Sequence, residues 1–284
     1  MVQPEKSSTG HLVEYDLHIH SSVSDGTLTP RQIIDTARQK KLKGVAITDH
    51  DDISIDGIKE YAAEQNMFYT YGIEFSTDIP NLHILGYQVD LHSPALREFL
   101  DEQKSGREKA IREMCKKTRA LGIPVDFEEI AESSTKTLGR PHLAELMVKK
   151  GYTSNIYEAF QKYLKNGKPV FVDYKKYNFL KILDIIINSK GIPVLAHPAM
   201  LRPELFYSVF SQAVKNNLAG LEVYYPRHSP DQKKRLKKLA REYNLIITGG
   251  SDFHGDIKPD IEIGSDGVNQ QEFERFIQLL QQKK

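Results

Sequence analysis

Hydrophobic and polar positions follow two different patterns along the chain. Short apolar runs, rich in β-branched residues, recur between segments that have the three-to-four-residue spacing of amphipathic helices. Helices are expected from Thr29, where a threonine cap precedes Pro30, and from Ser54. The predicted strands are 13–20, 44–50, 67–77, 81–90, 192–198, 220–226 and 245–255. Strands separated by helices predict βα units and a largely parallel sheet.

The alternation is interrupted between the fourth and the fifth predicted strand. From about Ser93 to Lys168 the chain has helical periodicity and many charged residues, with breaks at LGIP, SSTKTLGRP and KNGKP. Seven strands and this block predict an α/β fold, a barrel that carries a helical insertion. We therefore expect a barrel domain of residues 13–92 and 170–284, with an inserted helical cap of residues 93–169.

Composition excludes several classes of protein. The 284 residues are 39% hydrophobic, which is enough for a large core, and a net charge of +1 provides no field that would attract DNA or an anionic membrane. The single cysteine, Cys115, excludes a disulfide framework and a thiolate metal cluster. No apolar run approaches the roughly 18 residues of a membrane-spanning helix. Because the chain starts without an apolar signal segment, we expect a cytoplasmic protein with no membrane or DNA partner.

Ionisable side chains gather where the predicted strands end. His18 and His20 are two residues apart, so both point to one face of a strand, and Asp252 and His254 repeat this spacing. Glu74 lies within an apolar strand, where an unpaired carboxylate is costly. In all, nine such residues lie on or at the C-terminal side of predicted strands, the face that carries the active site in α/β barrels. They are His18, His20, Asp25, His50, Glu74, His83, His197, Asp252 and His254.

Each of these residues has an ordinary structural interpretation when taken alone. Asp25 precedes Gly26 in a turn, His50 could be the neighbour of a helix cap, and His83 could be a hydrogen-bonded core histidine. Taken together, imidazoles and carboxylates without thiolates suit zinc, manganese or iron. Nine ligands exceed the needs of one ion, so we expect two or three divalent ions (Mn, Fe or Zn) bridged by a carboxylate and water. Clustered cations commonly bind phosphoryl oxygens and generate a hydroxide at neutral pH.

The set of motifs resembles a known family. DLHIHSSVSDG, ITDHD, GIEFS, HILGY, AHP and SDFHG, in this order, are similar to the motifs of the PHP (polymerase and histidinol phosphatase) phosphoesterases. The resemblance covers about residues 13–92 and 170–265, and it implies a distorted (β/α)7 barrel with two or three metal ions at the C-terminal strand ends. It implies a first ion held by His18, His20, Glu74 and Asp252, a second by Glu74, His83 and His197, and a third by Asp25, His50 and His254.

The insertion resembles one branch of this family. LGRPHLAELMVKKGY and AFQKYLKNGKPVFV are similar to the branch that dephosphorylates nucleoside 3′,5′-bisphosphates, which also includes enzymes that trim RNA from its 5′ end. In that branch Arg140, His142 and His228 look like substrate contacts. An aspartate at position 25, where histidinol phosphatases often have histidine, also favours the nucleotide branch. Without the resemblance, Arg140 could simply start a helix, and His142 and His228 could be histidines without a role in binding.

The resemblance implies a metal-dependent hydrolase of phosphate monoesters. We expect a hydroxide bridging two ions to release the 3′-phosphate of 3′-phosphoadenosine 5′-phosphate and leave AMP, while Arg140 and His142 hold the other phosphate. The alternatives are a 5′-3′ exoribonuclease on short RNA, a histidinol phosphate phosphatase and a non-catalytic metal-bound scaffold. The basic segment DQKKRLKKLARE would suit an RNA backbone, although it also has the pattern of a solvated helix face. The expected partner is therefore a small nucleotide or a short RNA.

Overall fold

The computed structural model describes residues 12–53, 56–133 and 138–282. As expected, there are seven strands, and they form one sheet. Strands that are consecutive in the sequence are neighbours in this sheet. The strands are β1 (Tyr15–Ile19), β2 (Gly44–His50), β3 (Phe68–Ser76), β4 (His83–Tyr87), β5 (Ile192–Leu195), β6 (Gly220–Tyr224) and β7 (Ile246–Gly249). Each lies within a predicted strand, and most are shorter than predicted because the polar ends leave the sheet as loops.

The sheet is parallel except at β4. β1, β2 and β3 pair in parallel, as do β5, β6 and β7, whereas β4 is antiparallel to both β3 and β5. Residues 77–82 connect β3 to β4, and this segment is too short for the helical crossover that a parallel pair requires. The largely parallel sheet expected from the sequence therefore has one reversed strand.

The two ends of the sheet approach one another and nearly close a barrel. The backbone N–H of Asp252, just after β7, donates to the carbonyl oxygen of His18 at 2.8 Å, and that of His20 donates to Phe253 at 3.0 Å. These bonds place the residues that follow β7 beside the end of β1. The α/β barrel predicted from the sequence is thereby confirmed.

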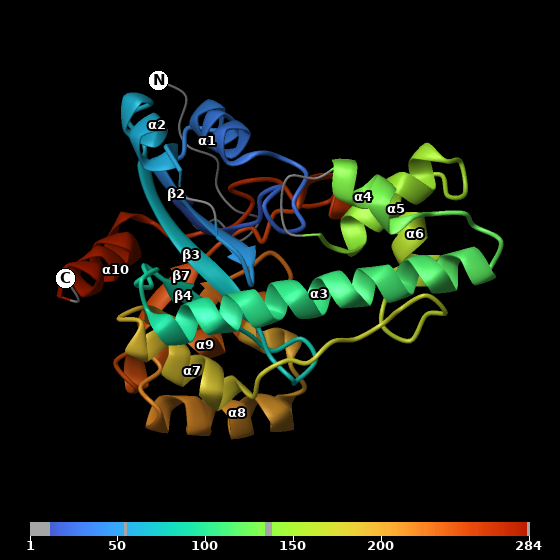
Figure 1. Cartoon of the computed structure of the whole chain (residues 1–284). Helices are drawn as coiled ribbons and strands as arrows, with labels where there is room; N and C mark the ends of the chain where they lie inside the picture. Colours follow the sequence, from blue (N-terminus) through green and yellow to red (C-terminus); the bar gives the residue numbers. More distant parts are fainter. Residues whose placement is uncertain (1–11, 54–55, 134–137, 283–284) are drawn as a thin grey trace.

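Helices cover the outside of the barrel (Figure 1). They are α1 (Pro30–Gln39), α2 (Ile58–Glu64), α7 (Phe179–Asn188), α8 (Pro203–Lys215), α9 (Pro230–Glu242) and α10 (Gln270–Gln282), with 3₁₀ turns η2 (Pro198–Met200) and η3 (Gly255–Ile257). Thr29 caps α1 in a capping box with Gln32, as predicted. α2 begins later than expected, at Ile58, and residues 54–55 lie outside the described part of the chain. None of the described helices is long and apolar enough to cross a bilayer.

The segment between β4 and α7 contains the long helix α3 (Pro94–Ala120). It is followed by α4 (Phe127–Ser133), α5 (Arg140–Lys149), α6 (Ile156–Ala159) and the π-helix η1 (Phe160–Leu164), which gather at the far end of α3 (Figure 1). Leu96 and Phe99, near the start of α3, pack in the barrel core, whereas Met114 and Cys115 belong to a separate core with α4 and α5. α3 therefore belongs to both cores, and the boundaries of the expected cap at 93 and 169 stay a prediction.

The closure of the barrel requires a glycine at position 250. A Cβ atom there would lie 2.4 Å from both the Cβ and the backbone nitrogen of His18, where the end of β7 passes β1. We expect Gly250→Ala to lower the free energy of unfolding by roughly 3 kcal/mol, because backbone atoms on both sides would have to move. Urea unfolding followed by circular dichroism measures this change.

Gly106→Ala in α3 is the matched control for Gly250→Ala. A Cβ at position 106 would meet only the side chain of Tyr174, at 3.2 Å. Equal destabilisation by the two variants would show that the contact with His18 does not limit the closure of the barrel.

Candidate metal centre

The nine residues expected from the sequence come from six strand ends and meet at one end of the barrel. His18, His50 and Glu74 lie on β1, β2 and β3, and the others follow β1, β5 and β7, except His83. His83 opens β4 rather than closing a strand, which differs from the expected position. Because β4 runs antiparallel to β3 and pairs its first residue with Ser76, His83 still reaches the same end of the barrel.

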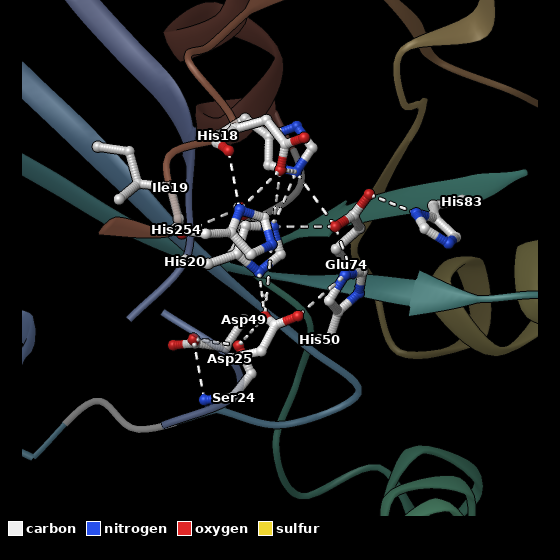
Figure 2. A network of polar contacts seen from close by, with 12 residues as sticks. His18, Ile19, His20, Ser24, Asp25, Asp49, His50, Glu74, His83 and His254 are labelled. Atoms are coloured by element: carbon white, nitrogen blue, oxygen red, sulfur yellow. Dashed lines mark hydrogen bonds and ion pairs between the residues drawn. The ribbon is translucent and has the colours of Figure 1, made fainter. Parts of the chain in front are cut away.

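Glu74 lies at the centre of this group, as Figure 2 shows. Its Oε2 atom lies 3.0 Å from His20 Nε2 and 3.3 Å from His18 Nε2. Its Oε1 atom lies 2.8 Å from His83 Nδ1 and 2.9 Å from His197 Nε2. His50 Nδ1 also lies 3.3 Å from Oε2. The two oxygens of this buried carboxylate thus face two different sets of imidazoles, as expected of a ligand shared between ions.

The donor atoms form three overlapping groups in which every atom lies within 4.8 Å of the others. The groups are His18, His20, Glu74 and Asp252; His20, Asp25, His50 and His254; and His50, Glu74 and His83. The first matches the expected first site, and the second contains the expected third site with His20 added. In the expected second site, the ring of His197 shares Glu74 Oε1 with His83. The structure thus brings all nine residues together, while the division of ligands among ions stays a prediction.

The charges of this cluster suit divalent cations. Burial opposes ionisation of Glu74, but the imidazoles of His50, His83 and His18 hold the pKa of its carboxyl well below the usual range. Burial, with His20 and Lys258, lowers the pKa of His254 to about 3, so this imidazole stays neutral. Anionic carboxylates and neutral imidazoles are the protonation states that metal ions need.

The carboxylates around His18 and His20 favour a positive charge on these two rings. Although burial opposes it, Glu222 and Glu74 raise the pKa of His18 to about 10. Burial also opposes protonation of His20, but hydrogen bonds to Asp25, Asp252 and Glu74 raise its pKa well above the usual range. The Nε2 atoms of the two rings lie only 3.2 Å apart. A bound divalent cation would supply the same positive charge, so the residues present fit the ions that the sequence implies.

Buried carboxylates outside the predicted ligand set hold the segments that carry the cluster. Asp49 accepts hydrogen bonds from the backbone and hydroxyl of Ser21 at 2.8 and 2.7 Å, and from the hydroxyl of Ser24 at 2.6 Å. These bonds fix the loop that carries Asp25, and Figure 2 shows a further bond, from the backbone N–H of Ser24 to Asp49. Asp16 accepts from the backbone N–H groups of Ser251, at 2.9 Å, and Gly264, at 2.8 Å, and so ties the segment after β7 to β1.

The sequence analysis missed these supporting carboxylates. One of them, Glu222, could have been found by the criterion that singled out Glu74, because it is a glutamate within the apolar strand GLEVY. Asp16 and Asp49 lie in DLHIH and ITDH, beside the predicted ligands, but no sequence signal separates a support from a ligand there.

Arg107 of α3 connects the helical insertion to the metal cluster. Its guanidinium donates to the carbonyl oxygen of His50 at 3.2 Å and to the carboxylate of Asp51 at 3.0 Å. Asp51 in turn accepts from the backbone of Ser76 at 2.9 Å. The arginine is one of many basic residues in the insertion, so the sequence contained no signal for this contact.

Two of the three expected substrate residues lie at the start of α5. Arg140 has its guanidinium near the rings of Phe160 and Phe171, at 5.7 and 5.5 Å from their centroids. The Nδ1 atom of His142 accepts from the backbone N–H of Gly139 at 3.1 Å. Burial lowers the pKa of both side chains, and the negative charge of Asp25 offsets part of this effect.

His228, the third expected substrate residue, is buried after β6. Its Nδ1 donates to the carbonyl oxygen of Val223 at 3.0 Å, and burial lowers the pKa of the ring. The ring is therefore neutral and its Nε2 atom carries a lone pair. Within the described part of the chain, this buried Nε2 has no hydrogen-bond partner. The backbones of Val223 and His197 partly offset the effect of burial on the pKa of the ring.

Curated relatives cover nearly the whole chain. The 5′-3′ exoribonuclease Rnm of Salmonella typhimurium is 32% identical over 268 residues, covering 91% of this chain and 90% of the relative. The 3′,5′-nucleoside bisphosphate phosphatase of Chromobacterium violaceum is 30% identical over 254 residues, covering 86% of this chain and 88% of the relative. These two names represent the two activities that the sequence left as alternatives.

Solved structures and a family match agree with the fold. A crystal structure from Bifidobacterium adolescentis, of a protein assigned as a metal-dependent phosphoesterase, has a TM-score of 0.83 at 25% identity and covers 93% of this chain and 96% of that one. An amidohydrolase from Chromobacterium violaceum has a TM-score of 0.78 at 28% identity, covering 89% and 90%. The PHP domain matches residues 16–191, which is more than half of the chain. The chain therefore belongs to the PHP domain family and is a metal-dependent phosphoesterase.

Proposed function

We propose that this phosphoesterase removes the 3′-phosphate from nucleoside 3′,5′-bisphosphates, with 3′-phosphoadenosine 5′-phosphate as the representative substrate. All nine predicted residues, from His18 to His254, would hold two or three divalent ions for this reaction. A relative with 30% identity carries the name of this activity. The identity of the metal and the location of the protein in the cytoplasm stay predictions.

The observation that carries this proposal is the environment of Arg140. Arg140 is half-buried, and its guanidinium lies near the two aromatic rings of Phe160 and Phe171. Its one hydrogen bond among the described residues is a 3.4 Å contact with the carbonyl oxygen of Leu164. A guanidinium with donors to spare suits a phosphate, which it can bind through two parallel hydrogen bonds. The bisphosphate supplies such a group at a distance from the phosphate that leaves.

In the proposed mechanism the chain positions both ends of the substrate. Bound divalent ions would activate water and neutralise the charge of the reacting phosphate. Arg140, with His142 beside it, would hold the remote phosphate, so that its binding energy orients the reacting one. The unpartnered Nε2 of His228 would accept a hydrogen bond from a hydroxyl of the nucleotide. Arg107 would keep the insertion, and with it Arg140, fixed relative to His50.

A second candidate activity is 5′-3′ exoribonuclease, because relatives with 32% identity carry that name. The same ions would act on a phosphodiester, and Arg140 would hold the 5′-phosphate of the RNA. The exposed basic side chains of α9 would meet the RNA backbone only if the strand continued along the outside of the barrel. They are Lys234, Arg235, Lys238 and Arg241.

A panel of three substrates separates these functions. The metal-stripped protein, reloaded with Mn²⁺, should release phosphate from 3′-phosphoadenosine 5′-phosphate much faster than from histidinol phosphate, and should leave 5′-AMP. Release of mononucleotides from a 5′-phosphorylated RNA trinucleotide, with little action on the bisphosphate, would establish the exoribonuclease instead. No turnover of any of the three by the loaded protein would leave the scaffold interpretation. Phosphate and product analysis by chromatography makes the comparison.

Arg140→Ala should affect the bisphosphate selectively. Loss of a charged hydrogen-bond donor to the remote phosphate should lower kcat/KM for 3′-phosphoadenosine 5′-phosphate roughly 10- to 100-fold. 3′-AMP lacks that phosphate, so its turnover should change little. Arg235→Ala, which removes an exposed arginine from α9, is the matched control for the bisphosphate. An equal loss on both substrates would contradict the role of Arg140 in binding the remote phosphate.

His50→Ala should abolish turnover without unfolding the protein. Loss of a residue that supports a metal ligand lowers metal affinity or activity about 10- to 100-fold, so removal of a direct ligand should lower activity more than about 100-fold. The control is His92→Ala, which removes an exposed histidine outside the predicted ligand set. Steady-state kinetics and circular dichroism measure the two effects. Full activity of His50→Ala would contradict the assignment of this residue as a ligand.

A further inference from the structure

Glu222 occupies an unusual position for a carboxylate. It lies in the middle of β6, is fully buried, and has the apolar neighbours Leu221 and Val223 in the sequence. Among the described residues its ion-pair partner is the ring of His18. A buried carboxylate is costly unless hydrogen bonds satisfy it, so its contacts should explain why it is there.

The first contact fixes the proton of His18. Glu222 Oε1 accepts from His18 Nδ1 at 2.9 Å, which places the ring proton on Nδ1. The other nitrogen, Nε2, lies 3.3 Å from Glu74 Oε2 and 3.7 Å from Asp252 Oδ1, and it would offer its lone pair to a metal ion that displaces its proton. Histidines that bind metals commonly donate their other ring N–H to a carboxylate in this way, which fixes the tautomer and the ring orientation.

The second contact holds the backbone of His197. This residue has a backbone φ angle of 28°, which residues other than glycine rarely adopt. Its backbone N–H donates to Glu222 Oε2 at 2.7 Å, while its Nε2 atom lies 2.9 Å from Glu74 Oε1. Such a backbone conformation persists only where the surroundings fix it, and this hydrogen bond is a direct restraint.

We propose that Glu222 is a positioning residue that aligns two metal ligands from different strands with one carboxylate. Its two oxygens hold His18 and His197, and these two rings face the two oxygens of Glu74. Glu222 thereby sets the separation of the ligands on either side of the bridging carboxylate. This inference rests on the metal-binding role of the histidines in the proposed function.

The test is the metal affinity of Glu222→Gln. A glutamine has the same shape but offers one acceptor oxygen, so one of the two contacts must be lost. The dissociation constant for Zn²⁺ is measured on the metal-stripped full-length protein by competition with a chromophoric chelator. We expect Glu222→Gln to bind roughly 10- to 100-fold more weakly than the wild type. The control Glu272→Gln changes another buried glutamate, which accepts from the hydroxyl of Tyr224 at 3.1 Å, and should bind as the wild type does.

The outcomes separate the inference from the proposed function. Unchanged Zn²⁺ affinity in Glu222→Gln would overturn the role of Glu222 alone, whereas a wild type that binds no Zn²⁺ would overturn the proposed metal site as well. If Glu222→Gln fails to fold, the ¹⁵N spectrum of the Zn²⁺-loaded wild type decides. A proton on Nδ1 of His18 with a metal-bound Nε2 supports the inference, and the opposite tautomer overturns it.

Discussion

The functional end of this barrel depends on one buried carboxylate, that of Glu74. Its two oxygens face imidazoles contributed by four segments of the chain, those of His18 and His20, His50, His83, and His197. A single buried carboxylate without such partners would be strongly destabilising. The strand arrangement is thus compatible with Glu74 only because several segments deliver their imidazoles to the same point.

A frame of further carboxylates supports this centre. Asp16, Asp49 and Glu222 each accept at least two hydrogen bonds from segments that carry predicted ligands. Metal ions require ligand atoms placed to within fractions of an ångström, and loops alone do not provide that accuracy. The hydrogen bonds of these three carboxylates restrain the loops at the end of the sheet that carry the predicted ligands.

The insertion carries Arg140 and His142, two of the predicted substrate contacts, and is joined to the barrel by α3. α3 packs on the barrel through Leu96 and Phe99 and on the second core through Met114, while Arg107 between them contacts the carbonyl oxygen of His50. A continuous helix and a buried ion pair therefore join the insertion to the segment that carries His50.

The sequence by itself determined the seven strands, the helical insertion and the nine polar residues at the strand ends. Strand periodicity and ionisable residues within apolar strands can both be recognised in a short stretch of sequence. The reversed direction of β4 was readable only in part, from the short connection before it. The tertiary structure alone decided that His20 shares a group with Asp25, His50 and His254, and that Asp16 and Asp49 support ligands instead of joining them. It also decided that Arg107 joins the insertion to His50. These features depend on distances between segments far apart in the sequence, which only the closed barrel fixes.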